Sequence, residues 1–94
     1  MMGMVEDAMR RKLSEALAPQ VLEIENESHR HAGHAGSPGT GESHFRLRII
    51  STAFAGLNRV DRQRLVYSIL ADELKGPVHA LAVRAVTPEE SGGS

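Results

Sequence analysis

Histidine is the residue of this chain whose type and spacing could support metal chemistry. The sequence holds five histidines and no cysteine, and imidazole is the commonest metal ligand among protein side chains. His29, His31 and His34 fall in one glycine-flanked stretch, His44 follows it, and His79 lies far downstream. On spacing alone such a cluster is more often a solvated loop than a metal site. A metal-site hypothesis therefore needs support from the rest of the chain.

Length and composition predict one small domain. The chain has 94 residues, of which 40% are hydrophobic and 24% charged, as in ordinary soluble globular proteins. The formal net charge of -1 argues against a bulk attraction to nucleic acid or to an anionic membrane. We expect a domain over residues 1–90 and a disordered tail at 91–94, in the cytoplasm or, if a presequence has been removed, in an organelle.

The first half of the chain predicts a helix followed by two strands. Apolar residues recur every fourth position from Val5 to Leu17, which predicts an amphipathic helix that ends before Pro19. Apolar and polar residues alternate over 21–26 and again over 44–50, the pattern of half-buried strands. The segment 28–41 lacks a hydrophobic period and predicts a long loop. The two strands then form an antiparallel hairpin with an oversized tip.

The second half predicts a helix and a final strand. Asn58 can cap a helix with Asp61 as its capping-box partner, and Gly76-Pro77 ends it. The nearly continuous apolar run 78–86 indicates a central strand. Thr87 can cap a short terminal helix with Pro88 at its first position. The resulting α/β order, αββαβ(α), predicts a three-stranded mixed sheet with helices packed on one face.

Several motifs occur in an order that resembles one known family. They are Asn26-Glu27-Ser28, Glu42-Ser43-His44-Phe45, Phe54-x-Gly56, Arg62-Gln63-Arg64-Leu65-Val66-Tyr67, Leu70-Ala71-Asp72-Glu73-Leu74, Gly76-Pro77-Val78-His79-Ala80-Leu81 and Thr87-Pro88-Glu89-Glu90. The ordered series, from about residue 5 to residue 90, resembles the BolA family. The resemblance implies a fold similar to class II KH domains, which agrees with the predicted order of elements.

The resemblance also implies a partner and a cofactor. BolA-like proteins pair with monothiol glutaredoxins and share a bridging [2Fe-2S] cluster. The family's Val-His-Ala-Leu motif carries one cluster ligand, which corresponds here to His79. The loop ligand corresponds most naturally to His31, with His34 and His29 as alternatives and His44 as a weak third candidate. The glutaredoxin cysteine and glutathione would complete the set, so we expect the isolated chain to be a monomer without a cluster.

The chemistry of the donor atoms is consistent with such a shared site. Imidazole can replace thiolate on one iron of a [2Fe-2S] cluster. A chain with histidines and no cysteine could supply only that half, so the thiolates must come from another protein. Because a histidine ligand must be unprotonated, cluster binding should weaken in acid.

Arginines provide an alternative function. Arg59, Arg62 and Arg64, with Arg46 and Arg48 on a strand, could form a basic patch. Some BolA-like proteins are transcriptional regulators, so DNA binding through the second helix is the competing hypothesis, although a net charge near zero favours a solvated arginine face. The sequence shows no arrangement of nucleophile and base, and we expect the protein not to be an enzyme.

Overall fold

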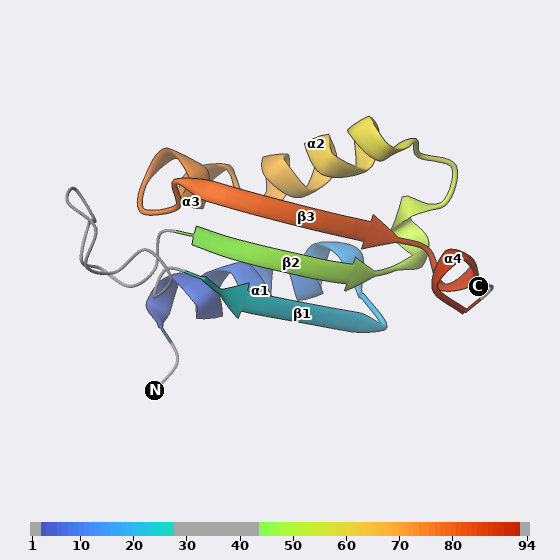
Figure 1. The fold of residues 1–94 in the computed structure, drawn as a ribbon, viewed down its shortest axis with the longest axis horizontal. Coiled ribbons are helices and arrows are strands. Elements are labelled where there is room, and N and C mark those ends of the chain that lie inside the picture. Colours follow the sequence, from blue (N-terminus) through green and yellow to red (C-terminus); the bar gives the residue numbers. More distant parts are fainter. Residues whose placement is uncertain (1–2, 28–43, 93–94) are drawn as a thin grey trace.

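The computed structural model describes residues 3–27 and 44–92. The elements in chain order are α1 (Met4–Leu17), β1 (Val21–Asn26), β2 (His44–Ile50), the 3-10 helix η2 (Thr52–Phe54), α2 (Arg59–Ile69), α3 (Ala71–Lys75), β3 (Ala80–Val86) and α4 (Pro88–Gly92). Figure 1 shows α1 crossing behind the sheet and α4 lying beyond the end of β3. None of the described helices is both long enough and apolar enough to cross a bilayer.

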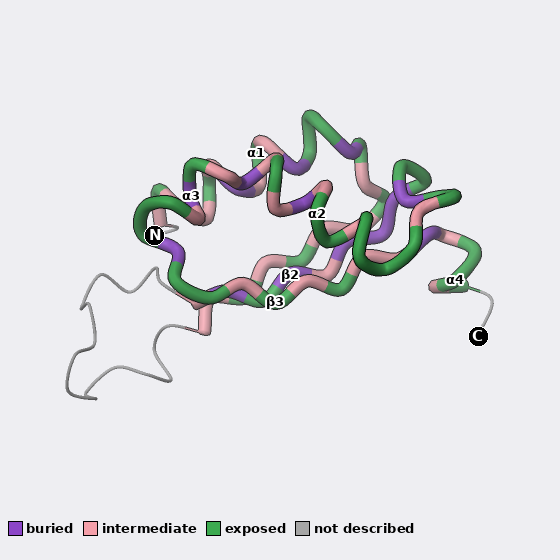
Figure 2. The backbone as a smooth tube through the Cα atoms, turned by 90° about the horizontal axis from the view of Figure 1, so that it is seen from above, coloured by how far each residue is buried: buried purple, intermediate pink, exposed green. Residues whose placement is uncertain are grey.

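The predicted mixed sheet is confirmed. The strand order is β1-β2-β3, with β1 antiparallel and β3 parallel to β2. Helices α1, α2 and α3 lie together on one face of the sheet (Figure 2), which leaves the other face open. The prediction that the last strand is central was wrong, because β2 takes that place and β3 lies at the edge. Alanines made the run look fully buried, whereas Ala80, Ala82 and Arg84 are exposed.

The helix α1 and the β1–β2 hairpin follow their predictions. Met9, Leu13 and Leu17 are at most 5% exposed and contact the inward-facing strand residues in one hydrophobic core. The helix ends where predicted, before Pro19: Ala18 adopts a left-handed conformation with φ of 43°. Both strands have the predicted bounds, because alternation along a strand reports directly which side faces the core.

The helix predicted between Asn58 and Gly76 is two helices. Asn58 caps α2 as predicted, since its Oδ1 accepts the Asp61 N–H at 2.8 Å. The helix is interrupted at Leu70, which has φ of -101° and ψ of 23°. Apolar periodicity continues across this residue, so no local sequence pattern marks the break. Leu70 is fully buried, and packing in the core favours the turn there.

The terminal helix α4 has a reciprocal capping box. The Thr87 N–H donates to Glu90 Oε1 at 2.8 Å, and the Glu90 N–H donates to Thr87 Oγ1 at 3.2 Å. Thr87 and Pro88 therefore have the predicted roles. The helix runs to Gly92, two residues into the segment expected to be a tail.

Candidate functional site

His79 lies in a short connection between a buried anchor and the edge strand. Val78 before it is 2% exposed and belongs to the core, while Ala80 after it begins β3. The Glu73 carbonyl accepts the N–H of Val78 at 3.0 Å and that of Gly76 at 3.2 Å. These contacts fix the backbone immediately before His79, whose side chain is exposed.

His79 is exposed, although the alternation of side chains along the strand would predict a buried position. Alternation along β3 would place His79 on the same side as Leu81 and Val83, which pack against the core. The regular strand begins only at Ala80, and Val78 rather than His79 takes the buried position. The side chain of His79 is therefore accessible to another molecule.

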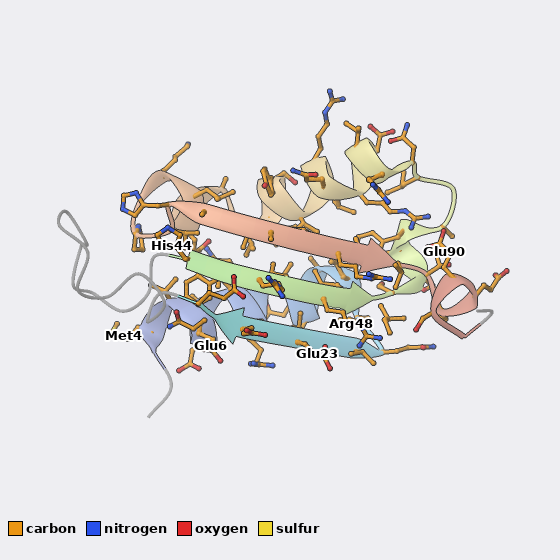
Figure 3. All side chains as sticks on the ribbon, viewed as in Figure 1. Met4, Glu6, Glu23, His44, Arg48 and Glu90 are labelled. Atoms are coloured by element: carbon orange, nitrogen blue, oxygen red, sulfur yellow. The ribbon has the colours of Figure 1, made fainter. Side chains whose placement is uncertain are left out.

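His79 and the two residues that border the histidine-rich segment lie at one end of the sheet. His44 pairs with Ala80 in the parallel register of β2 and β3, and the Glu27 N–H donates to the His44 carbonyl at 2.8 Å. Glu27 and His44 border the segment 28–43, and both of these residues lie near the start of β3. We call the group Glu27, His44, Val78, His79 and Ala80 the histidine edge; Figure 3 labels His44 there.

His29, His31 and His34 lie outside the described residues. Within residues 3–27 and 44–92, no group of three or more histidine, aspartate or glutamate side chains could hold a metal ion. Of the two described histidines, His79 is exposed, and His44 on the adjacent strand is partly buried.

An ion pair that the sequence did not reveal supports the turn before His79. Lys12 Nζ of α1 lies 2.7 Å from Glu73 Oε2 of α3. The hydrogen bond to Glu73 raises the pKa of Lys12 above its usual value. A cation on one helix and an acid 61 positions later carry no local signal of their pairing.

The arginine patch is divided by the fold. The Arg62 side chain is 14% exposed and bonded to Glu90, and it also donates to the carbonyls of Leu57 and Ala85. Arg62 is thus engaged within the fold, whereas Arg64 is exposed and has a loose 3.8 Å contact with Asp61.

Arg59 lines an open groove at the start of α2. The groove has a volume of about 790 Å³ and is bordered on the other side by residues 83–86 of β3, including Arg84. A DNA-binding surface on α2 would depend on Arg59 and Arg64, because Arg62 is bonded to Glu90.

Comparisons with known proteins agree with the sequence motifs. A family model described as BolA-like protein matches residues 13–90. Human BolA-like protein 1 is 54% identical over 88 residues, which cover 94% of this chain and 61% of the human protein. Protein BOLA1, chloroplastic, from Arabidopsis thaliana is 48% identical over 85 residues, which cover 88% of this chain and 53% of that protein. The chain thus spans just over half the length of these relatives.

A solved structure has the same fold. The BolA domain of SufE1 from Arabidopsis thaliana superposes with a TM-score of 0.85 at 47% identity, and the match covers 96% of this chain and 99% of that domain. The four helices and three strands described above therefore form a known α+β arrangement.

Proposed function

Because this chain belongs to the BolA-like protein family, we propose that it is an iron–sulfur adaptor that binds a monothiol glutaredoxin and co-ligates a bridging [2Fe-2S] cluster. In this proposal the cluster serves trafficking or iron and redox regulation, and the protein catalyses no reaction of its own. His79 is one ligand and a loop histidine, most naturally His31, is the other. The compartment is the cytoplasm or an organelle, and the chloroplastic Arabidopsis relative is consistent with an organelle.

The observation that carries the proposal is the histidine edge. An exposed imidazole at His79 lies at the same end of the sheet as Glu27 and His44, which border the histidine-bearing segment. Because both bordering residues lie near His79, a histidine of that segment would be tethered close to the first ligand. The rigid backbone on either side of His79 would hold one ligand in place while the segment supplies the second.

The donor set also supports a site completed by another protein. No described group of side chains could enclose a metal ion, and the chain has no cysteine. Imidazoles can ligate one iron of a [2Fe-2S] cluster whose other iron is held by thiolates. When bound, such a cluster would supply reversible one-electron redox chemistry and could itself be transferred to another protein.

Anaerobic reconstitution tests the proposal. The chain is mixed with a monothiol glutaredoxin, glutathione, iron and sulfide, and visible circular dichroism reports the asymmetry of the cluster. We expect a spectrum that differs from that of the glutaredoxin alone. His79→Ala should abolish the difference, and one of His31→Ala, His34→Ala and His29→Ala should weaken it more than the others.

His44→Ala is the matched control at the same edge. His44 contributes its backbone to the β2–β3 register, which the substitution preserves, so the spectrum of the mixed complex should be retained. An unchanged spectrum with His79→Ala would refute the ligand assignment. Duplex DNA binding at low salt that falls steeply as salt is added would favour the competing function instead.

A further inference from the structure

The turn that presents His79 is tied to the first helix through one ion pair. Lys12 Nζ and Glu73 Oε2 are 2.7 Å apart, and their side chains are 29% and 10% exposed. Lys12 also lies 3.8 Å from Asp72, but the Asp72 side chain is 87% exposed, and such exposed contacts contribute little. Lys12 is therefore the cation that balances the charge of the largely buried Glu73 carboxylate.

Among the described residues, no other side chain forms a hydrogen bond or ion pair with Glu73 that could replace Lys12. Its other carboxylate oxygen, Oε1, is buried and has no hydrogen-bond partner among the residues that the structure describes. Removing one partner of a buried ion pair leaves an uncompensated charge, which is strongly unfavourable. Without Lys12, the Glu73 carboxylate should turn toward water and draw α3 away from α1.

Movement of Glu73 would shift the backbone that precedes His79. The Glu73 carbonyl is the acceptor for both Gly76 and Val78, the two donors that fix the chain just before His79. The helix α3 has only five residues, and helices this short are not stable without tertiary contacts. The position of the turn is therefore coupled to the contact between α3 and α1.

From these contacts we propose that Lys12 is a positioning residue for His79, acting through Glu73 and the backbone of the following turn. This inference rests on the proposed function, in which His79 is a cluster ligand. In this role Lys12 acts through its ion pair with Glu73 and not by contact with the partner or the cluster. It holds the backbone turn that presents the imidazole of His79.

The first test needs no cluster. Amide hydrogen exchange is measured by NMR on the full chain and on Lys12→Met, which keeps most of the side-chain length and removes the charge. Exchange at the Gly76 and Val78 amides should rise about tenfold, the effect of losing one charge-assisted hydrogen bond. Amides in the middle of β2 should change less, and Lys12→Arg should restore slow exchange.

The second test uses the reconstituted complex with a monothiol glutaredoxin. Lys12→Met should accelerate loss of the visible dichroism several-fold, and Lys12→Arg should return the rate toward that of the unmodified protein. Arg10→Met is the matched control, because it removes a 3.4 Å ion pair with Glu6 on the same helix and should leave the rate unchanged.

The outcomes separate this inference from the proposed function. If His79→Ala abolishes the dichroism but Lys12→Met changes neither exchange nor cluster loss, the positioning role is refuted and the proposed function stands. An equal rise in exchange at every amide would also refute it, because that result indicates general destabilisation. If His79→Ala has no effect on the cluster, the assignment of His79 as a ligand fails and the positioning role fails with it.

Discussion

Arg62 on α2 and Glu90 on α4 form a two-point ion pair, with Nη1 2.6 Å from Oε1 and Nη2 3.0 Å from Oε2. The Arg62 guanidinium also donates to the carbonyls of Leu57 and Ala85. The same carboxylate accepts the N–H of Thr87. One cation thus joins the start of α2, the end of β3 and the terminal helix, at the end of the sheet opposite the histidine edge (Figure 3).

Replacing Glu90 with glutamine should reduce stability at neutral pH and have less effect in acid. The hydrogen bond from Arg62, and then the N–H of Thr87, lower the pKa of Glu90 from 4.5 to about 2. Because the folded-state pKa is lowered, the stabilisation is present above the unfolded value and disappears as pH falls toward about 2. Urea unfolding of both proteins across this range should show converging midpoints, and a constant difference would contradict the assignment.

Arg62→Lys should lower the free energy of unfolding by about 1–2 kcal/mol despite keeping the charge. A lysine ammonium cannot reproduce the fork that contacts Glu90 and two carbonyls together. Arg64→Lys is the control, since that side chain is 78% exposed and the change should stay within about 0.5 kcal/mol. Chemical denaturation measures both, and equal effects would show that the fork geometry is unimportant.

Tyr67→Phe should cost about 1 kcal/mol of stability. The Tyr67 hydroxyl donates to the Leu81 carbonyl at 3.0 Å, on a strand at the edge of the sheet. Phenylalanine keeps the ring and leaves this partly buried carbonyl without its donor. Thermal unfolding followed by circular dichroism measures the loss; an unchanged melting temperature would indicate that water replaces the hydroxyl.

His79→Ala should leave stability within about 0.5 kcal/mol of the unmodified protein, because the side chain is exposed. The neighbouring change Val78→Ala should cost roughly 2 kcal/mol, since Val78 is 2% exposed in the core. Urea unfolding of the two variants provides the comparison. A large loss with His79→Ala would mean that the histidine supports the fold, and its effect on any cluster could not then be interpreted as loss of a ligand.

Local sequence patterns predicted most of the elements correctly. The strands at 21–26 and 44–50 have the predicted bounds, because alternating burial is a property of consecutive residues. The break at Leu70 was missed, since the apolar spacing on both sides remained helical. The edge position of β3 was also missed. Small apolar residues such as Ala82 are typical of central strands, but Ala82 is exposed on the open face.

The sequence by itself determined the fold class, the core-facing residues and His79 as the leading candidate ligand, since each depends on local periodicity or on an ordered set of motifs. Only the tertiary structure brought His79 beside the borders of the histidine-rich segment and left its side chain exposed. The tertiary structure also formed the ion pairs between Arg62 and Glu90 and between Lys12 and Glu73. These relationships join residues far apart in the chain, and their contacts form only when the helices pack on the sheet, so no local pattern encodes them.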